Sequence, residues 1–414
     1  MGEIRMKNYT PAQFLAMHKA QISAPFPKVA VDLDEERFFE PGGEGEAIAA
    51  GMGYSRCYED EMDPELVAYW ASYDKGLKKE IHHGNSVWAE SRKFVTYTPM
   101  SAYKAENRER RYPLMILLTG ERDKPFVREG MGWCQMAARE EVLLLIPASV
   151  SEMGVLSAIR EAVDDLPVDR SRIYVCGFSN GAFRTAEFSI LHPDIVAACC
   201  SFGTEPYANI RWEPNDYMRR NLPDGHTTIA TSQRTIPFSP QVYQVARECM
   251  VPFIHIMGCN EGPRMIPFYK PCDPEIYAFY HSSEYIVENV NRKLWINHCP
   301  QTDILAVRAC KNSKNEVERI IGMPFDETHV EEHNKVHYYF GDVKSDDGVI
   351  RSRFVAVENM PHICGGAYPR IAWEFLKNFR RDEKHLDGID PFHHVMLSAY
   401  PGRYWPMKQK IEED

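Results

Sequence analysis

A serine flanked by glycines, placed between a strand pattern and a helix pattern, constrains the fold of this chain more than any other stretch. Ile173–Cys176 is rich in β-branched and aromatic residues, which favours a buried strand. Asn180–Leu191 contains no proline and has a broad apolar surface, and Pro193 predicts that this helix ends just before it. Between the two lies Gly177-Phe178-Ser179-Asn180-Gly181, a G-x-S-x-G pattern. A sharp turn from strand to helix needs glycines there, because a Cβ would collide with neighbouring backbone.

The position of Ser179 in this pattern predicts its chemistry. A serine at such a corner projects above the end of the strand. The first turn of the helix that follows has free N–H groups and the positive end of the helix dipole, and both stabilise an oxyanion. We therefore predict that Ser179 is a nucleophile. A glycine-rich turn with a solvated serine is the alternative that the pattern alone leaves open.

Strand and helix patterns alternate on both sides of this corner. Strands are expected at Tyr112–Leu118, Val142–Ile146, Val196–Phe202, Val251–Met257 and Arg353–Val357, and helices at Gly132–Glu141, Ser151–Leu166, Ser283–Ile296 and Tyr368–Arg380. Near-continuous apolar strands are typical of a parallel sheet that is covered on both faces. The alternation predicts βαβ units, and hence an α/β fold with a doubly wound, mostly parallel sheet.

The 414 residues are expected to form an N-terminal extension, residues 1–85, and one catalytic domain, residues 86–414. The alternation of strands and helices is interrupted at about 205–250 and about 263–345. Both stretches are too long for plain connections, so we predict that they are inserted lid or cap segments. Nothing in residues 1–83 carries recognisable chemistry, and no role is predicted for them.

The chain resembles α/β-hydrolases of the polyhydroxybutyrate depolymerase and feruloyl esterase type. The resemblance is carried by residues 169–181 with the serine pattern, by Ile254–Glu261, and by Met360-Pro361-His362. It extends over about 90–260 and 348–381. It implies the α/β-hydrolase fold and a serine esterase that forms an acyl-enzyme and needs no cofactor.

A catalytic serine needs a histidine that accepts its proton and a carboxylate that holds the tautomer of that histidine. In this fold the acid and the histidine follow the serine in sequence, on loops after later strands. Of the fifteen histidines, only His362 follows a late apolar strand in a loop rich in proline and glycine. His192, at the end of the serine's own helix, is expected to be structural.

Glu261 is the predicted acid, because it lies three residues after Gly258, at the end of a core strand. The family that the chain resembles usually has aspartate at this place, although glutamate has the same role elsewhere in the fold. Asp303 and Asp342, both within the second inserted segment, stay open as alternatives.

The resemblance also implies an oxyanion hole. One donor would be the backbone N–H of Asn180, and the other an N–H of the loop after Tyr112–Leu118. That loop typically contains His-Gly in the family, whereas this chain has Thr119-Gly120-Glu121. We therefore predict that the second donor is the N–H of Glu121.

The inserted segments are rich in aromatic residues, which suit an ester with an aromatic or apolar acyl or alcohol group. Trp212 and Tyr269 are the predicted substrate contacts. An acyltransferase or a peptidase with the same triad remains an alternative. A non-catalytic binding protein of the same fold is a second one.

The sequence also contains a possible zinc motif. His329-Val330-Glu331-Glu332-His333 fits H-x-x-E-H, which binds metal from one face of a helix. Pro324 before this segment and a strand pattern at Val336–Phe340 after it leave little room for a helix. We expect a solvated acidic turn there and no metal.

The composition limits which classes of binding partner and which cellular compartment are expected. The net charge of −11 argues against a nucleic-acid partner, and no apolar run reaches the length of a membrane span. Residues 1–25 do not have the pattern of a secretory signal. The eleven cysteines form no C-x-x-C pair, which favours free thiols in a reducing compartment. We expect a cytoplasmic protein with a small-molecule ester substrate; a homo-oligomer is left open.

Overall fold

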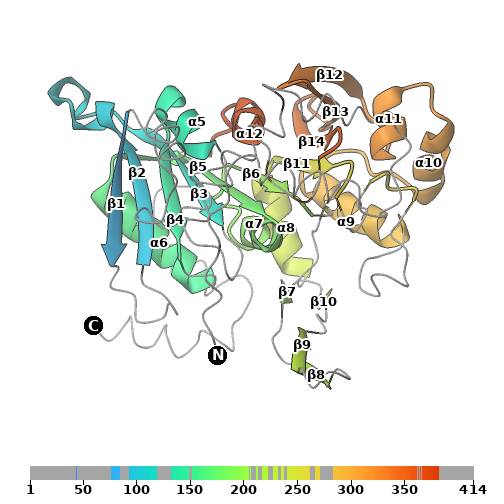
Figure 1. Cartoon of the computed structure of the whole chain (residues 1–414), viewed down its shortest axis with the longest axis horizontal. Coiled ribbons are helices and arrows are strands. Elements are labelled where there is room, and N and C mark those ends of the chain that lie inside the picture. The colour runs from blue at the N-terminus through green and yellow to red at the C-terminus, as the bar shows by residue number, and fades with distance from the viewer. Residues whose placement is uncertain are drawn as a thin grey trace.

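The structure is a computed structural model with a large sheet at its centre and helices on both faces (Figure 1). The residues that it describes are 76–83, 93–118, 132–148, 152–204, 240–261, 266–270, 283–360 and 366–381, four short strands between 211 and 236, and Gly43, Pro206, His362 and Cys364.

The central sheet has ten strands in the order β1-β2-β4-β3-β5-β6-β11-β14-β13-β12. Six neighbouring strands are parallel: β4 (Leu143–Pro147), β3 (Tyr112–Leu118), β5 (Val168–Phe178), β6 (Ala198–Phe202), β11 (Phe253–Gly258) and β14 (Ile350–Val357). Antiparallel pairs extend the sheet at both edges: β1 (Leu77–His83) with β2 (Lys93–Pro99), and β12 (Glu327–His333) with β13 (Val336–Lys344). This is the predicted doubly wound, mostly parallel α/β sheet.

Helices cover the sheet on both faces, and each face has its own apolar core. One core contains side chains of α5 (Trp133–Glu140) and α12 (Tyr368–Leu376). The other contains side chains of α6 (Glu152–Asp165), α7 (Asn180–Leu191), α9 (Ser283–Ile296), α10 (Ile304–Ala309) and α11 (Glu316–Ile321). Helix α8 (Pro240–Cys249) lies outside these two cores and packs against α7 and α9. Every residue of β3 is buried, as expected for a strand covered on both faces.

The predicted core elements are present, with boundaries that differ by a few residues. The helix expected at Tyr368–Arg380 ends at Leu376, and the strand of the serine corner begins earlier, at Val168. The sheet also reaches further than expected. Strand β1 lies in the part predicted to be an extension, while β12 and β13 lie in the second predicted insertion. Short strands pair within 211–236, β7 (Arg211–Trp212) with β10 (Thr235–Ile236) and β8 (Tyr217–Asn221) with β9 (Thr227–Thr231).

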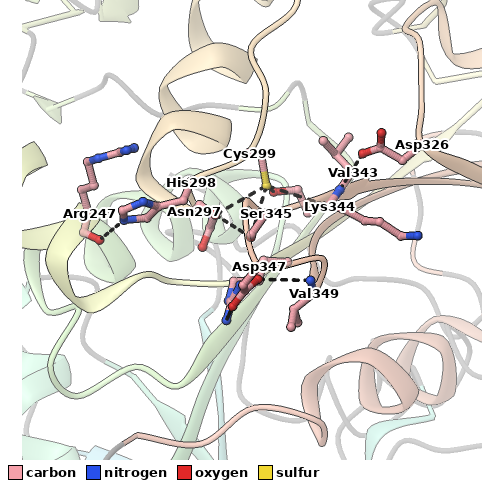
Figure 2. Close-up of polar contacts among 12 residues, drawn as sticks. Arg247, Asn297, His298, Cys299, Asp326, Val343, Lys344, Ser345, Asp347 and Val349 are labelled. Atoms are coloured by element: carbon pink, nitrogen blue, oxygen red, sulfur yellow. Dashed lines mark hydrogen bonds and ion pairs between the residues drawn. The ribbon is translucent and has the colours of Figure 1, made fainter.

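A polar cluster joins the C-terminal end of α9 to the segment between β13 and β14 (Figure 2). The Cys299 thiol lies 3.7 Å from the Ser345 hydroxyl, which donates a hydrogen bond of 2.6 Å to the Asn297 carbonyl. The His298 ring lies 3.1 Å from the carbonyl of Arg247 on α8. These contacts fix α9 to the segment that links β13 and β14, so part of the second predicted insertion is an integral part of the fold.

Arg381, the last residue of the described C-terminal stretch, binds backbone from two earlier parts of the chain. Its guanidinium donates hydrogen bonds to the carbonyls of Cys249 and Met250, at the end of α8, and of Ala197, before β6. Burial of the side chain lowers the pKa of Arg381 to about 10. Because three carbonyls surround the cation, its desolvation is offset by charge-assisted hydrogen bonds.

No helix in the described part of the chain is long and apolar enough to cross a membrane. The cysteines whose surroundings the structure gives are all free thiols, and most of them are buried. Cys134, Cys176, Cys199 and Cys200 are among the buried ones.

Candidate active site

The three predicted catalytic residues lie at one edge of the sheet. Ser179 follows β5, Glu261 follows β11 and His362 follows β14, and these strands are parallel within one sheet. The C-terminal ends of parallel strands meet at the same edge, which is where ligands bind in open α/β sheets. Residues that are far apart in sequence are brought together in this way.

Ser179 stands at a strained corner between β5 and α7. Its backbone has φ 54° and ψ −122°, in a region that residues other than glycine rarely adopt. The Ser179 N–H donates a hydrogen bond of 3.1 Å to the carbonyl of Phe202 on β6, which holds the corner against the sheet. A Cβ at Gly177 would lie 2.1 Å from the carbonyl oxygen of Gly181, so the first glycine of the pattern is required for the turn.

A chain of two hydrogen bonds joins the three side chains. The Ser179 Oγ lies 3.0 Å from His362 Nε2, and His362 Nδ1 lies 3.1 Å from Glu261 Oε2. An ionised carboxylate can only accept, so Glu261 favours the tautomer in which Nδ1 carries the hydrogen. The lone pair of Nε2 then faces the serine hydroxyl, which donates to it. The alternative acids, Asp303 and Asp342, do not take part in this series of hydrogen bonds.

The loop after β11 is joined to the loop after β14, and this junction holds Glu261 and His362 side by side. The Gly258 N–H donates a hydrogen bond of 2.8 Å to Glu261 Oε1, and the Asn260 N–H donates one of 3.0 Å to the Met360 carbonyl. The two loops approach so closely that a Cβ at Gly258 would lie 2.2 Å from the Met360 oxygen.

Burial and hydrogen bonding act in opposite directions on the two titratable groups. Burial raises the pKa of Glu261, which is 2% exposed, and the hydrogen bonds from His362 and Gly258 offset this rise in part. Burial lowers the pKa of His362, but the hydrogen bond and the negative charge of Glu261 raise it by more, so the net shift is upward. The side chain of His362 nevertheless keeps 40% of its surface exposed.

Phe178 is part of the site, although the sequence analysis assigned it no role. Its ring centroid lies 4.7 Å from that of His362 and 5.8 Å from that of Phe202. A Cβ at Gly203, where φ is 70°, would lie 2.2 Å from the Phe178 ring. The aromatic ring therefore packs against the imidazole and limits how far it can turn. Phe178 directly precedes the serine, but its contact with His362 depends on the fold of distant parts of the chain, so no local pattern indicated it.

The structure describes only one of the two predicted oxyanion donors. Asn180 is the first residue of α7, and N–H groups in the first turn of a helix have no partner within the helix. Glu121, like Thr119 and Gly120, lies outside the described residues. The second donor therefore remains a prediction.

The other candidate residues, Asp303, Asp342 and His192, make contacts that stabilise the fold. Asp303 accepts a hydrogen bond from the Ala306 N–H and caps α10, and Asp342 forms a two-pronged ion pair with Arg353. His192 is fully buried and lies 2.7 Å from a carboxylate oxygen of Glu152, at the opposite end of α7 from Ser179. The expectation that His192 is structural agrees with these contacts.

The side chain of Tyr269, one of the two predicted substrate contacts, packs against the core. The Tyr269 hydroxyl donates a hydrogen bond of 2.8 Å to the Arg319 carbonyl, and its ring packs against the core that contains α11. No contact of Tyr269 with Ser179 or His362 is present among the described residues. Trp212 lies in β7, but its side chain is outside the described part. Both roles remain predictions.

The acidic turn expected at residues 329–333 is wrong. These residues form most of β12, which pairs with β13 through a two-residue turn at Asn334 and Lys335. Both turn residues have positive φ, 49° and 63°, as the tight turns favoured in hairpins require. In a strand the two histidines of H-x-x-E-H cannot adopt the helical arrangement that this zinc motif needs. No cluster suited to a metal ion is found among the described side chains.

Comparisons with known proteins found relatives in structure alone. No family model and no curated protein matches the sequence. Serine hydrolase F (FphF) of Staphylococcus aureus, described as fluorophosphonate-binding, is 13% identical, with 45% of this chain and 80% of that chain covered and a TM-score of 0.35. A thermostable esterase is 12% identical, with 75% and 64% covered and a TM-score of 0.37. A ferulic acid esterase is 14% identical, with 45% and 79% covered and a TM-score of 0.33.

The strand order, the parallel core of the sheet and the sharp corner between β5 and α7 belong to this chain's own structure. By these features the chain has an α/β fold with a doubly wound, mostly parallel sheet.

Proposed function

We propose that this protein is a serine esterase that hydrolyses a carboxylic ester through a Ser179-His362-Glu261 triad. The observation that carries the proposal is the chain of hydrogen bonds of 3.0 and 3.1 Å that links the three side chains. The positive φ of Ser179 gives independent support, because strain of this kind is concentrated at functional sites.

The reaction would follow from this geometry. Ser179 Oγ attacks the ester carbonyl while His362 Nε2 takes the hydroxyl proton, and Glu261 stabilises the imidazolium that forms. The negative charge on the carbonyl oxygen is met by the N–H of Asn180 and a second N–H, assigned to Glu121. His362 then gives its proton to the leaving alcohol. Water, activated by the same histidine, releases the acid from the acyl-enzyme.

The upward shift of the His362 pKa suits its role as the general base. A more basic imidazole accepts the serine proton more readily, and general bases work best when their pKa lies near the pH of the reaction. The ester is proposed to have an aromatic or apolar group, because the two inserted segments are rich in aromatic residues. No cofactor is required by this mechanism.

A fluorophosphonate probe and an ester panel together test the proposal. We expect the probe to label Ser179, with the site found by peptide mass spectrometry, and Ser179→Ala to remove both the label and the ester hydrolysis. Ser101→Ala, a serine next to β2, is the matched control and should keep both. Label on a different serine of well-folded protein would refute the nucleophile assignment.

The panel distinguishes esterase from the related activities. It contains p-nitrophenyl and hydroxycinnamoyl esters of graded size, matching amides, and an added alcohol as acceptor. Hydrolysis of the esters with little transfer to the alcohol supports the proposal. Transfer to the alcohol in preference to water would indicate an acyltransferase, and faster cleavage of the amides a peptidase. A labelled protein inactive on all of these substrates would contradict esterase activity on this substrate class.

A further inference from the structure

Two cysteines lie opposite each other on β5 and β6, which are neighbours in the parallel part of the sheet (Figure 1). Cys176 of β5 is the register partner of Cys200 of β6. The register continues to the pair Phe178 and Phe202, and Ser179 follows directly. The cysteine pair therefore lies just before the serine corner.

The side chains of the two cysteines point to the same face of the sheet. Successive side chains of a strand alternate between the two faces, whereas register partners on neighbouring strands share a face. Cys176 and Cys200 both belong to the core that contains side chains of α5 and α12. Cys199 belongs to the core on the opposite face. Cys200 therefore faces Cys176, and its neighbour in sequence faces away.

The separation of the two strands suits a disulfide. Neighbouring strands of a sheet lie about 4.7–4.9 Å apart, and a disulfide spans Cα separations of about 4.4–6.8 Å. The Cβ atoms of the two cysteines must also not point away from each other. Register partners on one face meet both conditions, so the two sulfur atoms can bond without a rearrangement of the backbone.

The two thiols are in contact in the reduced protein. Burial raises the pKa of the Cys176 thiol, and a hydrogen bond with the Cys200 side chain raises it further. Cys176 Sγ also lies 3.2 Å from Met115 Sδ on β3. All three side chains are fully buried. The mechanism proposed for Ser179 uses none of these sulfur atoms, so their arrangement has no role in it.

The register distinguishes this pair from the other described cysteines. Cys176, Cys199 and Cys200 are the described cysteines that lie in strands. Cys199 is the register partner of Val175 on β5 and of Phe253 on β11. Among the described cysteines, Cys176 and Cys200 are therefore the one pair that the sheet places side by side.

We propose that Cys176 and Cys200 are a modification site, where hydrogen peroxide oxidises the two thiols to a disulfide that joins β5 to β6. The thiolate of one cysteine attacks a peroxide oxygen, which stays on the sulfur as a sulfenic acid, and the other oxygen leaves as hydroxide and takes up a proton. The second thiol then attacks the sulfenic sulfur, the S–S bond forms, and the sulfenic oxygen leaves as water. Two thiols and one peroxide thus give one disulfide and two waters.

Burial determines the course of this oxidation. A buried thiol with a raised pKa is rarely ionised, and peroxide reaches it only when the structure opens locally. The first step is therefore slow. The second step is fast by comparison, because the second sulfur is in contact with the first. We therefore expect a disulfide as the product and not a more highly oxidised sulfur.

Peptide mapping of the whole protein tests the proposal. Folded protein is exposed to hydrogen peroxide, the remaining thiols are alkylated after unfolding, and the peptides are analysed by mass spectrometry without reduction. We expect a cross-linked pair of peptides that contain Cys176 and Cys200 and that dithiothreitol separates. Cys200→Ala should abolish this link. Cys199→Ala removes the neighbouring thiol on the opposite face, so it is the matched control and should form the link like the wild type.

Cys176→Ala repeats the test if Cys200→Ala does not fold. A link that survives Cys200→Ala, or one that Cys199→Ala removes, would overturn the proposal. So would wild-type protein in which Cys176 and Cys200 stay free thiols after the less buried Cys249 has been oxidised, or in which both become sulfinic acids. None of these readouts depends on ester hydrolysis, so the result is independent of the proposed function.

Discussion

Gly258 sits where any side chain would collide with the loop that carries His362. Its N–H binds one carboxylate oxygen of Glu261, and the space that a Cβ would occupy is taken by the Met360 carbonyl. The distance between acid and base therefore depends on a residue that takes no part in the chemistry.

Gly258→Ala is expected to lower the rate of ester hydrolysis, because the Met360 loop must move and His362 moves with it. The relevant measurement is kcat/KM on one good ester together with the thermal unfolding midpoint. Gly348→Ala is the matched control: its Cβ would meet no atom within 4 Å, although φ there is 82°. The control should lose about 1–2 kcal/mol of stability from backbone strain and keep its activity. Equal losses of activity in both variants would contradict this account.

Glu261→Gln should lower kcat by several powers of ten, because an amide does not hold the required tautomer of His362. It should also change the pH profile of kcat/KM. Activity requires neutral His362, so it rises with pH through the pKa of this group. Glu261 raises that pKa, hence the variant's residual activity should begin to rise at a lower pH. An unchanged acidic limb would indicate that Glu261 does not act on His362.

At the scale of elements, Asp342 and Arg353 link β13 to β14. The carboxylate of Asp342 is 2% exposed and accepts two hydrogen bonds from the guanidinium, at 2.6 and 2.7 Å. Removing one partner of a buried pair leaves the other charge uncompensated. This contact explains why an acid inside the second predicted insertion is buried without being near His362.

Asp342→Asn is therefore expected to lower the free energy of unfolding by about 3 kcal/mol, while activity per folded molecule stays near that of the wild type. Urea unfolding and active-site titration with the fluorophosphonate probe measure the two quantities separately. Asp303→Asn is the comparison, because asparagine caps a helix about as well as aspartate and little stability should be lost. Loss of turnover in folded Asp342→Asn would move the predicted acid from Glu261 to Asp342.

The sequence was most informative where one physical effect dominates. Tyr112–Leu118 is buried on both faces, so its apolar run alone predicts β3, and the glycines around Ser179 predict the corner. Strand β12 was missed because its polar residues give no apolar alternation, and its conformation depends on pairing with β13. The contact of Phe178 with His362 depends on distant parts of the chain and cannot be read from local pattern.

At the scale of the whole molecule, the sheet is proposed to supply the chemistry, and the segments beside it the choice of ester. Trp212→Ala should lower kcat/KM strongly for the preferred bulky ester, since contacts made in the transition state affect kcat as well as KM. Acetyl esters, which are too small to reach such a wall, should lose little. Equal losses for both esters, in a variant that unfolds like the wild type, would show that Trp212 is structural.

The hydrogen bonds of Arg381 have a consequence for synthesis of the chain. Ribosomes release the protein from the N-terminus onward, so the carbonyls of Ala197, Cys249 and Met250 emerge long before the guanidinium that binds them. His362 also emerges late, well after Ser179. A nascent chain that is stalled before residue 381 should therefore lack the hydrogen bonds of Arg381 and fail to react with the fluorophosphonate. Reactivity should arise only after both His362 and Arg381 have left the ribosome.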